Sequence, residues 1–321
     1  MTLTTSLGPG AEFDRIRALA ALWKDRARGL GDDCAFLEVG AERLAVSVDL
    51  SVDGVHFRRD WLTPTEIGYR AAAAALSDLA AVAAEPLALL LAVAMPSEEP
   101  EATLLALGQG VGDAVAAAGA VVIGGDLSRG DRLTLDCCVL GRAPAPVRRA
   151  GATPGDLLVV TGALGGPLAA LTAWRRGVAP PSAARERFAH PPARHAAARY
   201  LAGLGARAMI DLSDGLGADL GHLLAAGGVG ARVEADRIPV HPDAAQAAAE
   251  AGESAWAFAA RSGEEYELLA AVPAGLSPNA LAAAPAPLTI IGVIEEEPGV
   301  RAADRGASVP LPGGWDHFGR P

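Results

Sequence analysis

The spacing of apolar residues predicts helices and strands in both halves of the chain. In chain order, we expect helices over 13–28, 63–84, 101–118 and 168–176, and strands over 44–48, 87–95, 121–123, 133–140 and 157–161. A further helix should begin at Pro191, and a further strand should follow Gly263. Segments rich in glycine, proline or aspartate separate these elements and read as loops.

The helix over 63–84 has the clearest start and the most unusual interior. Thr63 suits the N-cap, Pro64 the first helical position and Glu66 the third, which together form a capping box. Asp78 lies among alanine and leucine residues that make this helix apolar almost all round. Such a helix is buried, and a buried carboxylate must be paired or bind a metal ion. The alternative is a capping or solvent-facing aspartate, which suits the middle of a helix less well.

Aspartates recur where the predicted elements end. Asp32 and Asp33 are adjacent after Gly31, and like charges this close repel unless a cation lies between them. Asp126 follows two glycines at a predicted strand end, where a backbone can approach a ligand closely. We predict that the aspartates form one Mg²⁺-loaded site for a nucleoside triphosphate. The aspartates concerned are Asp32, Asp49, Asp53, Asp78, Asp126, Asp211 and Asp214. Of the adjacent pair, Asp32 is favoured over Asp33 as the metal ligand.

Simpler interpretations of three motifs stay open at this level. A plain turn also explains Asp126. Asp211 and Asp214 share a face if a helix starts there, but Ser213 or Asp214 serves equally well as an N-cap. The three glutamates within 264–267 are, by default, a solvated strand edge.

Length and charge limit the classes of protein that the chain can belong to. A chain of 321 residues suggests two domains, and the proline-rich segment 143–152 is the best boundary, so we predict domains over 1–146 and 147–321. The net charge of −11 argues against nucleic acid as a partner. Phosphorylated small molecules remain possible because bound metal ions reverse the local sign.

Individual residue types exclude several mechanisms. Lys24 is the only lysine, so the chain has neither the lysine-containing phosphate loop of P-loop enzymes nor a protein-kinase lysine. The 3 cysteines form no C-x-x-C pair and suit reduced thiols in the cytoplasm. No signal-peptide pattern is present, and the apolar run 87–95 is too short to span a bilayer, so we expect a cytoplasmic protein without a membrane partner.

The motifs together resemble the thiamine-monophosphate kinase family, within the wider aminoimidazole-ribotide-synthetase-like superfamily. The matching stretches follow the family's order over almost the whole chain, at 31–35, 46–49, 53–57, 76–81, 123–126, 149–156, 211–216, 263–268 and 315–318. The aspartate motifs recur across the superfamily. The element around His56 and the aromatic tail around Trp315 are more specific to the kinases.

The resemblance implies a two-domain fold with α/β and α+β parts. The N-terminal sheet would dimerise with a second copy, and ATP and several Mg²⁺ ions would lie in the cleft between the domains. The expected metal-associated residues are Asp32, Ser47, Asp49, Asp78, Asp126, Asp211 and Asp214. The expected contacts to ATP are Gly125, Asp126, Arg149 and Ser213, and those to the thiamine substrate are His56, Glu264 and Trp315.

Three departures from the family pattern bear on details of the site. Val48 stands where the family often has a threonine, so only its backbone carbonyl can serve a metal. Glu265 replaces an aspartate in the family's Gly-Gly-Glu-Asp-Tyr-Glu-Leu motif. The aromatic residue often found upstream of Asp126 has no counterpart here, where the chain reads Gly-Gln-Gly at 108–110.

The implied reaction is ATP-dependent phosphorylation of thiamine monophosphate to thiamine diphosphate. The acceptor is a phosphate monoester, which is largely dianionic at neutral pH, so no general base is required. We expect direct in-line, Mg²⁺-assisted transfer without a phosphoenzyme, and Arg149 is a plausible phosphate clamp.

The alternatives are other enzymes of the superfamily and an inactive binding protein. A selenophosphate synthetase should have a reactive cysteine or selenocysteine before Asp32, and a hydrogenase-maturation carbamoyl dehydratase should end in cysteine; this chain has neither feature. An aminoimidazole ribotide synthetase would not require the aromatic tail around Trp315. The retained aspartates argue against a protein that only binds metal and nucleotide.

Overall fold

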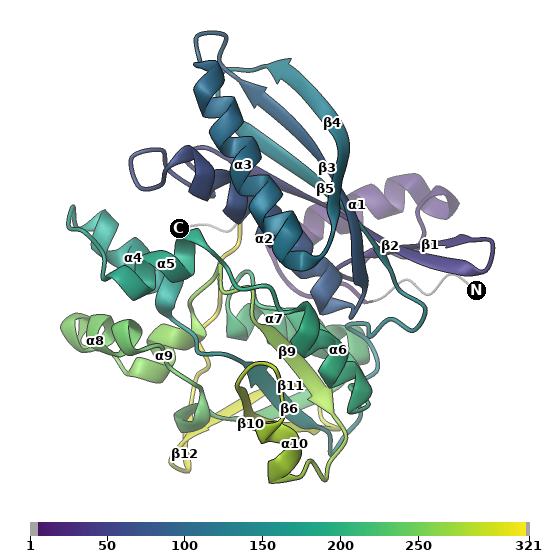
Figure 1. The fold of residues 1–321 in the computed structure, drawn as a ribbon. Helices are drawn as coiled ribbons and strands as arrows, with labels where there is room; N and C mark the ends of the chain where they lie inside the picture. The colour runs from purple at the N-terminus through teal and green to yellow at the C-terminus, as the bar shows by residue number, and fades with distance from the viewer. Residues whose placement is uncertain (1–5, 319–321) are drawn as a thin grey trace.

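The protein folds as two β-sheets with helices packed on them, as a computed structural model of residues 6–318 shows (Figure 1). The five-stranded sheet has the order β1-β2-β5-β3-β4, and only β3 and β4 run parallel within it. Its strands are β1 (Ala35–Val39), β2 (Glu42–Val52), β3 (Glu85–Met95), β4 (Val121–Arg129) and β5 (Thr134–Arg142). The helices of this half are α1 (Ala11–Trp23), η1 (Lys24–Arg26), α2 (Pro64–Ala81) and α3 (Glu101–Ala118).

The second half forms a seven-stranded sheet with the order β12-β11-β8-β10-β6-β9-β7. Its strands are β6 (Leu157–Thr161), β7 (Ala208–Asp211), β8 (Gly230–Glu234), β9 (Leu268–Val272), β10 (Leu288–Glu295), β11 (Gly299–Asp304) and β12 (Ala307–Val309). Its helices are α4 (Gly166–Arg175), α5 (Ser182–Ala189), α6 (His195–Gly203), α7 (Leu216–Gly227), η2 (Ala235–Arg237), α8 (Pro242–Ala251), α9 (Ala255–Ala260) and α10 (Pro278–Ala282). The two-domain α/β architecture is thereby confirmed.

The five-stranded sheet buries one face and exposes the other. Leu89, Leu135 and Cys137 point to the α2 and α3 side and are fully buried. Val48 and Leu50 alternate with less exposed positions of β2 and are 63% and 47% exposed. This alternation is typical of a sheet with one packed face. The other face therefore offers a broad apolar surface, which we call the open face.

α2 is the element that joins the two halves. It packs against β2 and β5 of the first sheet and also against β7 and α6 of the second half. The Thr63 hydroxyl accepts from the Glu66 amide, and the Glu66 carboxylate accepts from the Thr63 amide, so the predicted capping box is confirmed. Because it is buried on several sides, α2 carries residues into the space between the sheets.

Two glycines let α2 and α3 cross at very short range. A Cβ at Gly68 would lie 2.0 Å from the Leu107 carbonyl oxygen, and one at Gly110 would lie 1.9 Å from the Thr65 carbonyl oxygen. Only glycine fits at such backbone contacts. Gly110 therefore serves helix packing, whereas a Cβ at Gly108 would meet nothing within 4 Å.

The structure confirms several predicted bounds and corrects others. The helix over 101–118 and the strand over 157–161 are as expected. The first helix stops at Trp23 because Lys24 has a left-handed φ of 51°. α2 stops at Ala81, and Ala83, with φ 55°, turns the chain toward β3.

The strand predicted over 121–123 is longer than expected. β4 continues through Asp126 to Arg129 in parallel register with β3, so Asp126 does not lie at a strand end. A Cβ at Gly125 would lie 1.7 Å from the Leu91 carbonyl oxygen, which explains the glycine by close strand approach.

Candidate active site

Three carboxylates converge between the two sheets. Ligand oxygens of Asp33, Asp78 and Asp211 all lie within 4.8 Å of one another. Asp33 comes from the loop before β1, Asp78 from the body of α2 and Asp211 from the last position of β7. We call these three residues the acidic cluster. α2 makes it possible, because its packing against both sheets carries Asp78 to the end of β7.

Two serines hold the cluster in place. Ser47 donates a hydrogen bond to Asp78 Oδ2 over 2.6 Å, and Ser77 donates one to Asp211 Oδ2 over 2.6 Å. Burial, with the charge of Asp211, raises the pKa of Asp78 well above its ordinary value. Burial and the charge of Asp33 raise the pKa of Asp211 to about 7. The site therefore holds more negative charge than its own contacts compensate.

Arg149 is the cation that the protein itself supplies. Its Nη2 and Nε donate to the Asp33 carboxylate over 2.6 and 3.1 Å, and its backbone amide donates to Asp32 Oδ1 over 3.1 Å. Asp32 Oδ2 is buried without a hydrogen-bond partner among the described residues. Burial and the charge of Asp33 raise the pKa of Asp32 to about 6.

These residues fit a divalent cation. One arginine faces several carboxylates, and the free Asp32 oxygen is a buried acceptor that lacks a donor. Hard cations such as Mg²⁺ prefer carboxylate oxygen ligands. The structure places Asp33 within the cluster of three, although the sequence favoured Asp32 as the ligand, and Asp32 lies directly beside it.

Asp49 lies between the acidic cluster and Glu264 and interacts electrostatically with both. Its charge acts on Asp78 and Asp211, and its own pKa is raised to about 7 by burial and by the charge of Glu264. Asp49 and Ser47 point to the α2 side of β2, as their alternation with the exposed Val48 and Leu50 shows.

Asp126 and Gly125 lie elsewhere within this chain. Asp126 pairs with Ala92, which pairs with Asp136, which in turn pairs with Leu50, so these four residues share the open face. Two strands separate β4 from β2, so Asp126 is roughly 14 Å across the sheet from Leu50 at about 4.8 Å per strand. Ser47 and Asp49, the predicted metal residues on β2, face the opposite side of this sheet.

The segment 211–215 forms a loop between β7 and α7 rather than the start of a helix. α7 begins at Leu216 with Gly215 as its N-cap, so the expectation that Asp211 and Asp214 share a helix face was wrong, as was the N-cap role for Ser213 or Asp214. Asp219 Oδ2 accepts hydrogen bonds from the Asp214 and Gly215 amides over 3.2 and 3.0 Å. The buried Asp219 therefore shapes the loop that carries Asp214.

The predicted substrate residues gather at the other end of the site. The rings of His56 and His317 are 5.1 Å apart, and the rings of His317 and Trp315 are 5.9 Å apart. Glu264 is near enough for its charge to act on His56, whose pKa is nevertheless lowered, chiefly by burial. His56, Glu264 and Trp315 thus surround one region, which also contains His317.

Glu264 is held by two residues that sequence analysis did not single out. Arg70, buried in α2, forms an ion pair with the Glu264 carboxylate, and the Tyr266 hydroxyl donates to Glu264 Oε2 over 2.6 Å. Glu264 and Tyr266 have left-handed φ values of 63° and 51°. Such strain persists where surrounding contacts over-determine it. The sequence contains a signal for Arg70, because a charged residue within this apolar helix is as unusual as Asp78.

The expected solvated edge at 264–267 is wrong. Glu265 and Glu267 are both fully buried. Glu267 pairs with Arg187 over 2.7 Å and with Arg194 over 2.5 Å. Glu265 accepts a hydrogen bond from the Gly165 amide over 2.5 Å. These buried ion pairs attach the segment that follows Glu264 to α5 and to the start of α6, so Glu265 and Glu267 are structural supports of the site.

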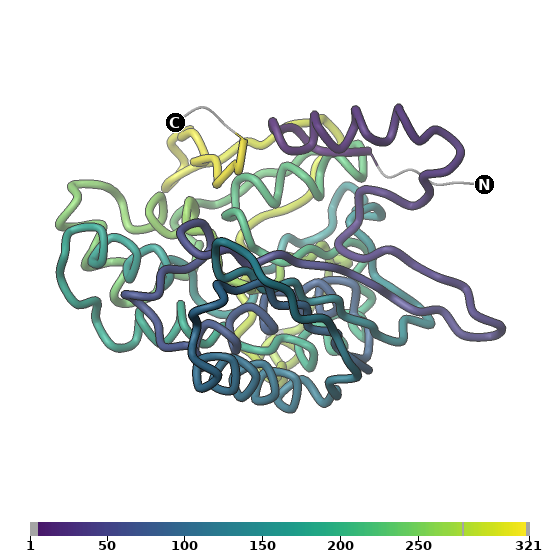
Figure 2. The backbone as a smooth tube through the Cα atoms, turned by 90° about the horizontal axis from the view of Figure 1, so that it is seen from above, coloured from purple at the N-terminus to yellow at the C-terminus, as the bar shows by residue number. Residues whose placement is uncertain are grey.

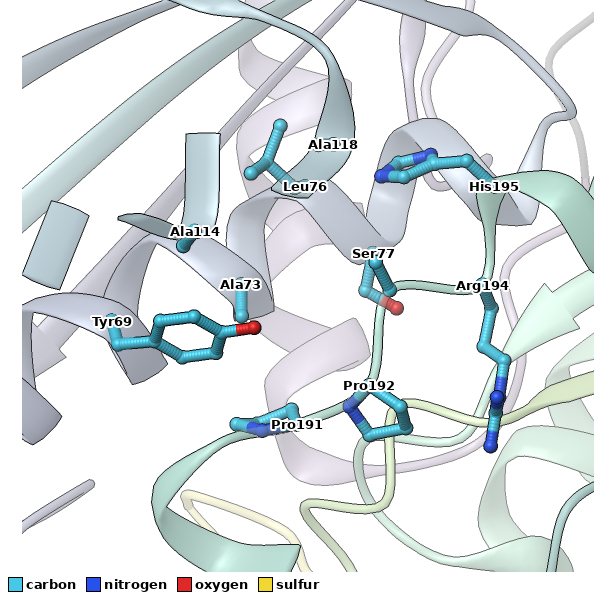
Figure 3. A pocket seen from close by; sticks show the side chains of 11 residues that line it. Tyr69, Ala73, Leu76, Ser77, Ala114, Ala118, Pro191, Pro192, Arg194 and His195 are labelled. Carbon is cyan, nitrogen blue, oxygen red and sulfur yellow. The ribbon is translucent and has the colours of Figure 1, made fainter. Parts of the chain in front are cut away.

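A small pocket lies on the other side of Ser77 (Figure 3). It lies between α2, α3 and the segment before α6, with Tyr69 and Pro191 on one side and His195 on the other. None of the described residues that line it carries a carboxylate. It therefore shares Ser77 with the site but has no part of the acidic cluster.

Comparison with known families matches both halves of the chain. Residues 31–143 match the family model described as AIR synthase related protein, N-terminal domain, and residues 153–305 match the corresponding C-terminal domain. No helix in the described range 6–318 has the length and apolar character to cross a membrane.

Several proteins of similar sequence share one description. Thiamine-monophosphate kinase of Mycobacterium tuberculosis (strain CDC 1551 / Oshkosh) is 38% identical over 77% of this chain and 76% of its own length. The same-named protein of Salmonella typhimurium is 36% identical over 96% of each chain. A solved structure described as AaThiL complexed with AMPPCP and TMP superposes with a TM-score of 0.86, at 27% identity, over 96% of this chain and 97% of that one.

Proposed function

The chain belongs to the thiamine-monophosphate kinase family, and we infer that it phosphorylates thiamine monophosphate with ATP to give thiamine diphosphate. The observation that carries this function is the acidic cluster of Asp33, Asp78 and Asp211 between the two sheets. A set of carboxylates in excess of the local cations suits a site for Mg²⁺ and polyphosphate.

We propose that Mg²⁺ ions are held by the cluster with the neighbouring predicted ligands. Those ligands are Asp32, Ser47, Asp49, Asp78, Asp211 and Asp214, and Asp33 is added to them on its position. Bound Mg²⁺ would neutralise phosphate charge and polarise the transferring group. Arg149, already beside Asp33, supplies a planar cation that can reach a phosphate when a metal ion takes over that carboxylate.

The chain's own residues orient the acceptor rather than activate it. The thiamine phosphate would lie with its rings near His56, Glu264 and Trp315 and its phosphate toward Asp49 and the cluster. Glu264, held by Arg70, offers a fixed carboxylate for the ring system. Since the phosphate monoester is already largely dianionic near pH 7, transfer requires positioning and charge neutralisation, not a base.

We propose further that the open face is covered by a second copy of the chain. In this homodimer, Asp126 of the partner subunit would reach the site together with Gly125 of the partner subunit, because Asp126 faces away from the cluster in its own chain. The exposed Val48 and Leu50 give such an interface its apolar surface. The domains would extend over 1–146 and 147–321, and the enzyme would work in the cytoplasm.

A coupled assay tests the function. Purified protein with ATP, Mg²⁺ and thiamine monophosphate should form thiamine diphosphate, and folded protein that binds ATP but forms no product would refute the proposal. An exposed carboxylate remote from the site gives the control, Asp236→Asn, which should retain full activity.

Complementation tests the shared site. Asp126→Asn and Asp211→Asn should each abolish turnover with the fold intact. If Asp126 acts across the dimer, mixing the two variants restores one intact site in each mixed dimer, or about a quarter of the wild-type activity at random mixing. No recovery after confirmed subunit exchange would place Asp126 in the site of its own chain.

A further inference from the structure

The N-terminal and C-terminal segments of the described chain meet at the first turn of α1. The Ala11 amide donates a hydrogen bond to Asp316 Oδ2 over 2.7 Å, across 305 positions of sequence. The N-cap residue is Gly10, with φ 129°, and it has no side chain that could accept this bond. Figure 2 shows the purple N-terminal helix beside the yellow C-terminal segment. The tail therefore supplies the capping carboxylate that the N-terminal sequence lacks.

Few other contacts hold α1 to the rest of the protein. The Arg15 guanidinium lies 4.0 Å from the centre of the Phe318 ring, and the Phe13 ring stacks on His222 of α7 at 4.1 Å. No residue of α1 is buried. A helix with so little buried surface has low local stability. Its position thus depends on the tail and on α7.

The tail also forms one wall of the substrate region. The Trp315 amide donates to the Asp214 carbonyl over 2.8 Å, which fixes the tail to the loop before α7. Asp316 follows directly, and the His317 ring faces His56. Asp316 Oδ1 accepts a hydrogen bond from the Phe318 amide over 2.9 Å, so the same carboxylate orders the tail and caps the helix.

We propose that Asp316 is a positioning residue that clasps α1 and thereby holds Trp315 and His317 over the ring system of the bound thiamine phosphate. The clasp acts on the aromatic end of the acceptor and not on ATP, since Asp316 lies in the tail between Trp315 and His317, and the His317 ring faces His56 while the Trp315 ring contacts His317. α1 then serves as an anchor for a wall of the acceptor site. This inference rests on the proposed kinase function for its substrate, but the clasp itself does not.

Steady-state kinetics and hydrogen exchange test the clasp. Asp316→Ala should raise KM for thiamine monophosphate about five- to tenfold, the loss expected for one helix cap, with kcat and KM for ATP within about twofold of wild type. Asp316→Asn, which keeps an oxygen acceptor, should recover most of the affinity. Asp236→Ala is the matched control, because it removes an exposed aspartate from the second half.

Hydrogen exchange gives a readout that does not need activity. Amides of 11–23 should lose protection in Asp316→Ala and regain it in Asp316→Asn, while those of α2 stay unchanged. Unaltered protection of 11–23, or equal loss of affinity for both substrates, would overturn the proposal. If Asp316→Ala does not fold, Arg15→Ala breaks the contact with Phe318 and should show the same selective rise in KM, and its absence would equally refute the clasp. A wild-type protein that makes no thiamine diphosphate refutes the kinase function instead, and the exchange data still decide the clasp.

Discussion

Removing the charge of Asp211 should stabilise the metal-free protein. The residue is 4% exposed, and burial with the charge of Asp33 raises its pKa from 3.8 to about 7. The folded-state pKa of Asp211 is above its unfolded value. The contribution of this carboxyl to folding stability is therefore complete below about pH 4 and is lost as the pH rises to about 7. A shift of about three units at roughly 1.4 kcal/mol each limits the cost to about 4 kcal/mol above neutral pH.

The variant Asp211→Asn isolates this cost. The asparagine oxygen can still accept the hydrogen bond from Ser77, so the main change is the lost charge. At pH 8 in EDTA, its free energy of unfolding should exceed that of wild type by as much as about 4 kcal/mol, and at pH 5 by only about 1 to 2 kcal/mol. Urea unfolding at both pH values measures the difference.

The dependence on pH is the decisive result. Any fixed change in packing or hydrogen bonding affects Asp211→Asn equally at both pH values, so only the charge produces the difference of about 2 to 3 kcal/mol. Asp236→Asn, with its carboxylate in water, should show no such difference. An equal effect of Asp211→Asn at pH 5 and pH 8 would mean that the cluster carries no net electrostatic strain, and the argument for a cation would lose its main physical basis.

Mg²⁺ at 100 times its Kd should raise the free energy of unfolding by about 2.7 kcal/mol. Asp78→Asn should largely remove this gain, and a calorimetric titration with Mg²⁺ measures the loss. Arg70→Met should lower the free energy of unfolding in urea by about 3 kcal/mol, because it leaves the Glu264 carboxylate without its buried cation. The same variant should raise KM for thiamine monophosphate. An unchanged KM would mean that Arg70 has no effect on the substrate region. Leu89→Ala should cost about 2 to 5 kcal/mol, since Leu89 is fully buried, whereas Leu105→Ala, at a position 65% exposed, should stay within about 0.5 kcal/mol of wild type in the same measurement.

The sequence predicted the parts of the site that local rules control. The capping box of α2 and the apolar surroundings of Asp78 are both readable within one helix. Asp33 was harder, because its place depends on a loop whose partner, Arg149, is more than a hundred residues away. Glu265 and Glu267 were misread for the same reason, since their cations come from the distant Arg187 and Arg194.

The position of Asp126 shows another limit of local reasoning. Two glycines before an aspartate look like a strand end, but here the second of them, Gly125, permits close contact with β3 inside a longer strand. Strand register decides which face Asp126 occupies, and register is a property of the whole sheet. The cap that Asp316 provides to α1 also lies beyond any sequence window, because it spans almost the full chain.

The packing of α2 has a consequence for any attempt to work with the two halves separately. One continuous apolar core contains Leu76 of α2 and Leu89 of the first sheet together with Phe188 and Phe258 from the second half. A chain cut near residue 146 would expose this surface on both fragments, so we expect each half alone to aggregate and the two to require co-expression for recovery as a complex. Gene fission would therefore follow the family boundary in sequence but cut through an apolar core that the two domains share.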